Sequence, residues 1–421
     1  MRRWGALAIA VLLAACSGGI VPPSGPSGRP APHRPYRQPP ARQPVPATPI
    51  APIQSSGPST GPNAARAGIV AGPSVASLPI SQTQAARALD AFRLSCATLQ
   101  RRTDSSGLTR PGDWQPACAA AQQAGGDPRD FFARWFETAQ VGDGRAYATG
   151  YYIPEIAGSR ARRSGYDVPV YGRPSDLIDV DLGLFSDSLK GKKIRGRVEG
   201  SNFIPYYDRA AIELGAIDNR APIIAWAADT VEMFFLQVQG SGILRLPDGQ
   251  TLRIGYDSQN GRDYTGIGAL MKNRGLIGPG QTSMQGIVQW LHDHPDQARG
   301  VMDENKSFVF FRVLDGPPVG ALGVAVTGGT SAAVDPKFIP LGAPVFLSMD
   351  RTDATNLWIA QDTGGAIKGA NRVDTFWGSG DEARAIAGGM SARGTAFVLL
   401  PIGTVARLSR EGFGGGASPQ R

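Results

Sequence analysis

The sequence predicts a mainly β protein with a small group of helices ahead of its strands. Three observations support this fold class. Apolar residues recur at helical spacing in few segments, short apolar runs bounded by glycine and proline dominate from Tyr147 onward, and strands do not alternate regularly with helices. The chain has no Rossmann or phosphate-loop glycine pattern, so these observations argue against a nucleotide-binding α/β fold.

The N-terminus has the pattern of an export signal. Arg2 and Arg3 precede an apolar run that ends in Leu13-Ala14-Ala15-Cys16, and this run is too short for a permanent membrane anchor. The ending resembles the bacterial lipobox, which makes residues 1–15 a signal peptide and Cys16 the lipidated first residue. Ser17 follows the cysteine, which in lipoproteins favours the outer membrane. The alternative is an ordinary cleaved signal with a chance cysteine.

Residues 16–80 are predicted to be a disordered tether behind the lipidated cysteine. They contain 16 of the 34 prolines, interspersed with Gly, Ser and Ala, and no periodic apolar face. The 64 residues that follow Cys16 would span roughly 45 Å as a flexible coil.

The formal charge of +8 does not indicate nucleic-acid binding. Arg2 and Arg3 leave with the signal peptide, and the tether carries five arginines and no acid, so residues 81–421 keep a net charge near +1. No run of lysines and arginines interleaved with aromatics appears there. We expect no nucleic-acid partner.

Two helices are predicted at the start of the folded part. Ala85, Leu89, Phe92, Cys96 and Leu99 recur at helical spacing after the cap candidates Ser81 and Thr83. Asp127-Pro128 opens a second apolar pattern, which runs to Phe136. Cys96 and Cys118 suit an oxidising compartment, where a structural disulfide between helices is plausible.

Strands and one further helix are expected downstream, and about 340 residues are enough for two packed domains. The predicted helix lies near Met284 to His292. The predicted strands lie at the apolar runs Ile223 to Trp226, Val231 to Val238, Phe308 to Phe311, Val345 to Leu347, Leu357 to Ile359 and Phe397 to Leu400.

Three aspartates interrupt the apolar strands of the C-terminal part. Asp335, Asp362 and Asp374 each lie directly after or between apolar residues. An isolated buried carboxylate is costly, so such residues are hydrogen-bonded for structural reasons or kept for chemistry.

These three segments resemble the 3D domain, named for its aspartates, and the MltA family of lytic transglycosylases. The similarity rests on Gln361 to Gly369 and on Asp374 with Phe376-Trp377-Gly378, and it spans about Phe131 to Pro401. Further matching motifs lie at Thr149 to Pro154, Ile204 to Tyr207, Gln237 to Gly242 and Asn305 to Phe311.

The resemblance implies two domains with a glycan groove between them. Residues 81–152 and 295–405 would form a double-psi β-barrel (3D) domain with N-terminal helices, and residues 153–294 an inserted β domain. Residues 406–421 are expected to be a disordered tail.

By the same resemblance the chain would cleave the β-1,4 bond between N-acetylmuramic acid and N-acetylglucosamine in peptidoglycan, in cell-wall turnover. Asp374 would be the general acid and base, and it must be substantially protonated near neutral pH. Phe376 and Trp377 could supply apolar surroundings, and Asp362 or Asp335 a neighbouring charge. Both aspartates, as supporting residues, have an equally plausible structural role. Sugar-binding candidates in matched motifs are Thr149, Tyr151, Gln237, Gln239, Ser241 and Lys368.

We expect no cofactor and no metal. The partners would be glycan strands, the outer membrane through Cys16 and proteins of cell-wall synthesis or division, with the protein facing the periplasm. His292 and His294 form a His-x-His without further ligands at metal spacing. Asp362-Thr363-Gly364 resembles an aspartic protease signature, but no second copy exists. A catalytically silent peptidoglycan-binding lipoprotein remains the alternative.

Overall fold

The structure is a computed structural model that describes residues 44–54, 60–278, 281–317 and 319–413. The predicted signal peptide, Cys16 and residues 17–43 and 55–59 of the predicted tether lie outside these residues. Within the described ranges, every helix is too short or too polar to span a bilayer.

Part of the predicted tether is packed on the folded domain, so the prediction of disorder up to residue 80 is wrong there. Pro46 forms an isolated bridge with Arg351, and the Ile50 amide donates to Ser348 Oγ at 2.8 Å. Further on, α1 (Ala64–Ala67), β1 (Ile69–Ala71) and the 3-10 turn η1 (Val75–Ser77) follow. Ile50 and Ile53 do not form a periodic apolar pattern in the sequence. They are nevertheless partly buried against the core of the folded domain, which also accepts hydrogen bonds from their backbone amides.

The predicted N-terminal helices are confirmed. In α2 (Gln82–Leu99), Ser81 and Gln84 form a capping box, and Asp127 caps α4 (Pro128–Trp135). Between them lie the 3-10 turn η2 (Pro111–Trp114) and α3 (Gln115–Gln123). A disulfide joins Cys96 of α2 to Cys118 of α3.

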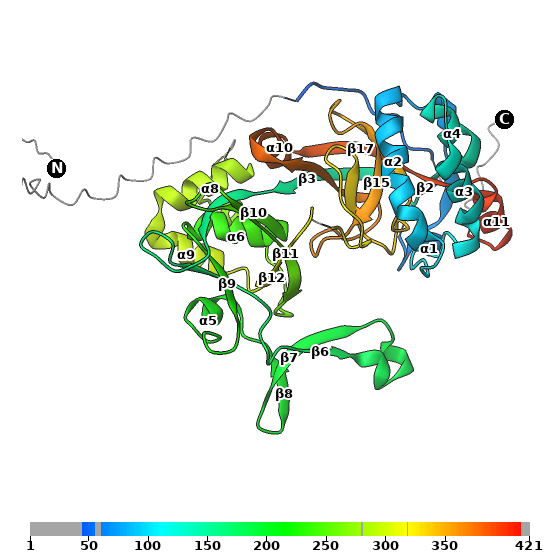
Figure 1. The fold of residues 1–421 in the computed structure, drawn as a ribbon. Coiled ribbons are helices and arrows are strands. Elements are labelled where there is room, and N and C mark those ends of the chain that lie inside the picture. Colours follow the sequence, from blue (N-terminus) through cyan, green and yellow to red (C-terminus); the bar gives the residue numbers. More distant parts are fainter. Residues whose placement is uncertain (1–43, 55–59, 279–280, 318, 414–421) are drawn as a thin grey trace, which may run out of the picture. The chain divides into compact units, whose positions relative to one another are not determined.

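The main sheet closes into a barrel beside these helices (Figure 1). Besides β1, its strands are β2 (Phe136–Val141), β3 (Arg145–Ile153), β13 (Ser331–Val334), β14 (Pro344–Met349), β15 (Asn356–Asp362), β16 (Arg372–Ser379) and β17 (Ser391–Pro401). The order β17-β14-β15-β13-β16-β3 returns to β17 through the β3–β17 pairing, so six strands form a closed ring. The predicted strands at residues 345–347, 357–359 and 397–400 are confirmed as β14, β15 and β17.

The chain between β3 and β13 builds a second body around a six-stranded sheet in the order β12-β11-β10-β4-β9-β5. Its strands are β4 (Glu155–Ser159), β5 (Val168–Tyr171), β9 (Ile223–Ala227), β10 (Ser241–Arg245), β11 (Thr251–Gln259) and β12 (Val309–Val313). Its helices are α5 (Arg209–Glu213), α6 (Thr230–Gln239), α7 (Ile267–Asn273), α8 (Met284–Asp293) and α9 (Pro295–Asp303). We call this body the insert. The strands near 223–226 and 308–311 and the helix near 284–292 are confirmed.

The predicted end of the insert at residue 294 is wrong. Both α9 and β12 belong to it, because β12 pairs with β11 and α9 shares an apolar cluster with α6, α7 and α8. The motif at Asn305 to Phe311 does not reveal whether its strand joins the barrel or the sheet of the insert. The sequence therefore could not place the end of the insert.

The strand predicted over Val231 to Val238 is wrong as well, because this segment is the helix α6. Asp229 caps it by accepting from the Glu232 amide, and Gly240, with φ of 78°, ends it. Residues 233–237 are all buried, so the segment lacks the one-sided period that identifies a helix.

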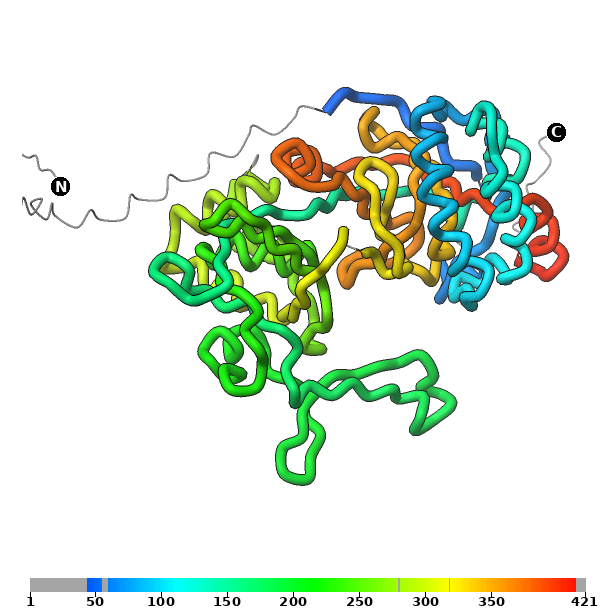
Figure 2. Tube along the Cα trace, viewed as in Figure 1, coloured from blue at the N-terminus to red at the C-terminus, as the bar shows by residue number. Residues whose placement is uncertain are grey.

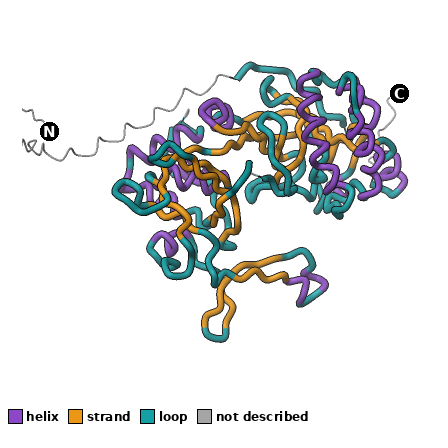
Figure 3. Tube along the Cα trace, viewed as in Figure 1, coloured by secondary structure: helices purple, strands orange, loops and turns teal. Residues whose placement is uncertain are grey.

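A three-stranded arm extends from the insert, shown in green at the lower right of Figures 1 and 2. It consists of β6 (Ile178–Asp181), β7 (Lys193–Glu199) and β8 (Asn202–Pro205), in that order. The 3-10 turns η3 (Leu182–Leu184) and η4 (Asp187–Leu189) form its tip, drawn as helix in Figure 3.

The end of the chain differs from the predicted tail at 406–421. Helix α11 (Thr404–Arg410) reaches into it, and Leu408 of this helix is fully buried, whereas α10 (Gly380–Gly388) precedes β17. Arg407 donates to the Leu108 carbonyl at 2.8 Å, which ties α11 to the N-terminal helical region. Only residues 414–421 of the predicted tail lie outside the described residues.

Candidate active site

Asp374 lies near the start of β16, a strand between two others of the barrel. On one side it is paired in parallel register with Thr149 of β3, and on the other it is opposite Ala333 of β13. The insert separates Thr149 from Asp374 in sequence, and barrel closure brings the two together.

A hydrogen-bonded chain fixes one oxygen of this carboxyl group. Thr149 Oγ1 donates to Asp374 Oδ1 at 2.5 Å, and Arg372 Nη2 donates to Thr149 Oγ1 at 2.9 Å. Because side chains alternate along a strand, Arg372 and Asp374 share one face of β16. Among the described residues, no protein group hydrogen-bonds the second oxygen, Oδ2, which is therefore available to a ligand.

Burial raises the pKa of the Asp374 carboxyl from 3.8 to about 6. The Thr149 hydrogen bond and the charge of Arg372 both lower this pKa, and the charge of Asp362 raises it. Asp374 nevertheless keeps partial solvent contact at its surface. A carboxyl with this pKa can exist in both protonation states near neutral pH.

Asp362, at the end of β15, has both oxygens occupied by donors. The amides of Ala321 and Thr363 donate to Oδ1 at 2.8 Å each, and the Tyr151 hydroxyl donates to Oδ2 at 3.0 Å. Burial raises the pKa of Asp362, although these three donors oppose the shift. Asp362 is the aspartate whose charge acts on Asp374.

Tyr151, on β3, has a hydroxyl that is influenced by the charges of both Asp362 and Asp374. Burial raises the pKa of its hydroxyl well above 10, and the charges of Asp362 and Asp374 add to this. The hydroxyl therefore stays a donor. Its ring packs on Phe376 of β16 with centroids 4.9 Å apart, so Phe376 supplies apolar surroundings to the site.

Trp377 does not share that face. Its indole Nε1 donates to Thr375 Oγ1 at 2.9 Å and its ring packs edge-on against Trp358, 5.6 Å away. Since neighbouring residues of a strand point to opposite faces, Trp377 cannot accompany Asp374 and Phe376.

Asp335 is buried apart from the Asp362–Asp374 pair. Its carboxylate accepts from the Gly369 amide at 2.9 Å and from the Lys337 amide at 3.1 Å. It thereby fastens the loop 363–371 to the end of β13. This geometry corresponds to the structural alternative for Asp335 rather than to a neighbouring charge.

The sugar-binding candidates other than Thr149 and Tyr151 lie on three other elements. Gln239 of α6 accepts from the Tyr152 amide at 3.1 Å, and Gln237 is buried with an Oε1 that no described protein group pairs. Lys368 is exposed on the 363–371 loop. Ser241, at the start of β10, lines a pocket of about 460 Å³ together with Phe376 and Gly378 of the barrel.

Two residues that the sequence did not single out also belong here. Arg372 carries the chain of hydrogen bonds to Asp374, and its position two residues before Asp374 on a strand was a usable signal. Tyr264, on the insert loop between β11 and α7, has its pKa raised by burial and by the charge of Asp374. No local pattern marks Tyr264, because only the packing of insert against barrel brings it near.

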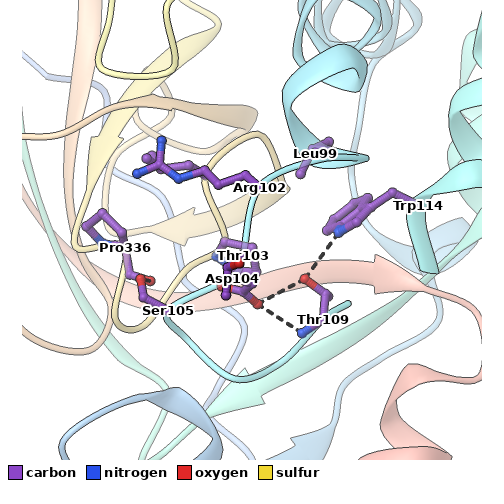
Figure 4. Close-up of a pocket in the computed structure, with 10 residues that line it drawn as sticks. Leu99, Arg102, Thr103, Asp104, Ser105, Thr109, Trp114 and Pro336 are labelled. Atoms are coloured by element: carbon purple, nitrogen blue, oxygen red, sulfur yellow. Dashed lines mark hydrogen bonds between the residues drawn. The ribbon is translucent and has the colours of Figure 1, made fainter. Parts of the chain in front are cut away.

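A second pocket, of about 20 Å³, lies at the end of α2 (Figure 4). Asp104 there accepts from the amide and the hydroxyl of Thr109 at 2.9 Å each, and Trp114 Nε1 donates to that hydroxyl at 3.1 Å. Ser105 donates to the Pro336 carbonyl at 2.9 Å. These groups satisfy one another and support the turn after Asp335, so the pocket has the character of a structural void.

The two histidines of the His-x-His face different neighbours. His292 pairs with Asp229 at 3.1 Å, whereas His294 stacks on Trp290 with ring centroids 4.3 Å apart. The hydrogen bond to Asp229 raises the pKa of His292.

Comparison with known proteins places this geometry in a family. Residues 147–312 match the MltA specific insert domain and residues 330–400 match the 3D domain. Membrane-bound lytic murein transglycosylase A of Escherichia coli strain K12 is 30% identical over 293 residues, which are 66% of this chain and 73% of that protein.

Solved structures similar to this chain are also MltA proteins. MltA from Neisseria gonorrhoeae has 37% identity and a TM-score of 0.68, covering 87% of this chain and 98% of that one. MltA of E. coli with bound chitohexaose has 25% identity and a TM-score of 0.59, covering 84% and 99%. The chain belongs to the MltA family of membrane-bound lytic murein transglycosylases.

Proposed function

We propose that this protein cleaves the β-1,4 bond between N-acetylmuramic acid and N-acetylglucosamine of peptidoglycan and leaves a 1,6-anhydromuramic acid end. The observation that carries the proposal is the state of Asp374. Its pKa of about 6 keeps a protonated fraction near neutral pH, and Thr149 occupies Oδ1 while Oδ2 remains available.

In the first step Asp374 acts as the general acid. The protonated Oδ2 gives its proton to the glycosidic oxygen, and the bond from that oxygen to C1 of the muramic acid breaks. The bonding electrons stay on the leaving oxygen, which becomes the 4-hydroxyl of the departing sugar. C1 is left with oxocarbenium character.

In the second step the same residue acts as the base. The C6 hydroxyl of the muramic acid attacks C1, and its proton passes to the Asp374 carboxylate. The 1,6-anhydro ring closes, the acid is regenerated, and no water is consumed. The reaction therefore needs one working carboxylate and no cofactor.

Asp362 is proposed as a supporting residue. Three donors occupy its oxygens, so it is poorly placed to attack C1 or to activate water. Its negative charge instead holds the pKa of Asp374 up, and Tyr151 connects it to the apolar floor formed by Phe376. Asp335 supports the site indirectly by fixing the loop that carries Lys368.

The glycan is proposed to contact Thr149, Tyr151, Gln237, Gln239, Ser241 and Lys368. The pocket lined by Ser241 gives a concave surface that reaches Phe376, two residues from Asp374 on the same face of β16. The buried, unpaired Oε1 of Gln237 is an acceptor suited to a sugar hydroxyl or to water. The E. coli relative that binds chitohexaose supports an oligosaccharide ligand at this site.

We further propose that the protein is an outer-membrane lipoprotein facing the periplasm, anchored through lipid on Cys16. The signal pattern at residues 1–15 supports this, as does the membrane-bound description of its E. coli relative. Proteins of cell-wall synthesis or division are proposed partners, on the grounds of the substrate alone.

The test is mass spectrometry of the fragments that the protein releases from purified sacculi. We expect anhydro-muropeptides from the unaltered protein and from Asp248→Asn, an exposed control carboxylate, and none from Asp374→Asn. Reducing ends would indicate a hydrolase. Sedimentation with sacculi but no fragments from the unaltered protein would favour a silent binding lipoprotein.

A further inference from the structure

The arm formed by β6, β7 and β8 has two faces of opposite character. The register pairs Ile178 with Gly196, Val180 with Ile194, and Val198 with Phe203, and Gly196 also pairs with Pro205. Directly paired residues share a face, and successive residues alternate. One face is therefore wholly apolar, and it comprises Ile178, Val180, Ile194, Gly196, Val198, Phe203 and Pro205.

The other face is charged and lies toward the insert. Arg195 pairs with Asp179, and Lys193 lies 3.8 Å from Asp181. The Arg197 guanidinium lies 4.2 Å from the centre of the Tyr207 ring, and Arg195 Nη1 lies 3.3 Å from the Tyr256 hydroxyl. These contacts direct the charged face to the body of the insert, so the apolar face points away from it.

The apolar face has no cover within the described chain. Val198 is 59% exposed and Ile194 is 43% exposed, and Ile178 and Phe203 are 39% and 38% exposed. None of the residues on this face joins any of the apolar clusters found among the described residues. A soluble sheet normally exposes its polar face, so this arrangement indicates a partner.

The tip of the arm adds apolar and basic groups. Leu184 is 85% exposed and Phe185 is 74% exposed. The tip, residues 182–192, carries two lysines, Lys190 and Lys192, against one acid, Asp187, an excess of one positive charge. Segments that bind in the headgroup region of anionic bilayers typically combine exposed leucine and phenylalanine with lysines.

We infer that the arm is a membrane-docking element, whose apolar face and tip rest on an anionic phospholipid surface. The lysine excess complements the charge of such a surface. A bilayer also takes up a broad apolar face without requiring matched shape, whereas a protein partner would need a complementary groove. Docking of the arm would hold the insert at the membrane, separately from any lipid on the N-terminus.

The test places a fluorescent reporter on the arm of the full-length chain. Cys96 and Cys118 are joined in a disulfide, so Leu184→Cys combined with Cys16→Ser leaves one free thiol for a polarity-sensitive dye. Asn202→Cys, exposed on the charged face, is the matched control. Because the dye reports the surroundings of the arm itself, the reading does not depend on how the N-terminus is held.

With vesicles of phosphatidylethanolamine and phosphatidylglycerol, we expect the dye at residue 184 to shift to the blue and brighten about twofold or more, as on transfer to the headgroup boundary. The dye at residue 202 should stay aqueous. Exchange of the two tip lysines, Lys190 and Lys192, for glutamate should weaken the response on the order of thirtyfold in lipid concentration.

A dye at residue 184 that stays aqueous with these vesicles would overturn the inference. So would a shift that appears without lipid and grows with protein concentration, because the partner would then be a second copy. Release of fragments from sacculi by the labelled proteins should be unchanged, since no arm residue belongs to the site. This keeps failure of the docking inference distinct from failure of the proposed activity.

Discussion

Replacing Thr149 with valine should raise the pKa of the catalytic carboxyl and move the pH dependence of cleavage. Valine keeps the shape of threonine but cannot donate to Asp374 Oδ1, where the present hydrogen bond measures 2.5 Å. That bond stabilises the ionised carboxyl, so it lowers the pKa of Asp374. Without this bond, less remains to counteract the effect of burial, so the pKa of Asp374 must rise.

The size of the effect follows from the strength of such a bond. A hydrogen bond to a charged group contributes about 1.5 kcal/mol at the lower end, which corresponds to roughly one pKa unit. The pKa of Asp374 would then move from about 6 in the unaltered protein to roughly one unit higher. At pH 7 the protonated fraction of the acid would grow from roughly a tenth to about half.

The assay is kcat/KM for fragment release from soluble glycan strands between pH 5 and pH 9. Activity should fall as pH rises through the pKa of the acid, and the midpoint of this fall should lie about one unit higher for Thr149→Val. Thr149→Ser, which keeps the hydroxyl, should retain the original midpoint. A valine variant whose midpoint is unchanged or lower would refute the assignment of this hydrogen bond.

Three further predictions concern stability and the second aspartate. Asp374→Asn should stabilise the fold at pH 7.5 by about 1–2 kcal/mol and have little effect at pH 4, as measured by urea unfolding. The reason is that the folded state raises the pKa of Asp374 from 3.8 to about 6, so ionisation of this group destabilises the fold only as the pH rises above 3.8. The double exchange of Cys96 and Cys118 to serine should lower the free energy of unfolding by about 3 kcal/mol, given the sequence separation of 22 residues; an unchanged urea midpoint would contradict it. Tyr151→Phe removes a donor that lowers the pKa of Asp362, so less charge acts on Asp374 and the fall in kcat/KM should begin at lower pH, opposite to Thr149→Val; a shift in the same direction would count against the coupling.

The sequence predicted those parts of the fold that depend on local signals. The caps at Ser81 and Asp127 mark the starts of α2 and α4, and short apolar runs between glycines mark β14, β15 and β17. Parts that depend on tertiary context were missed. Helix α6 is buried on nearly every side, and it therefore has no amphipathic period.

The three aspartates show the same limit within the candidate site. Their positions beside apolar residues are alike in sequence, yet Asp374 keeps an oxygen available, Asp362 has both oxygens occupied, and Asp335 binds the Gly369 amide. Which donors surround a carboxylate depends on strand register across the barrel, and register cannot be read from one strand. The packing of residues 44–54 on the barrel was hidden for a related reason, because extended segments rich in proline have no period whether or not they are bound.

The insert also determines when the catalytic group can come into existence. Thr149 and Asp374 are 225 positions apart, and ribosomes deliver the first long before the second. Until β16 and β17 are made, β3 lacks both of its neighbours in the ring, while the insert can already form its own sheet. A chain that stalls or is clipped upstream of Arg372 therefore has no assembled acid, so unfinished copies lack the group on which cleavage is proposed to depend.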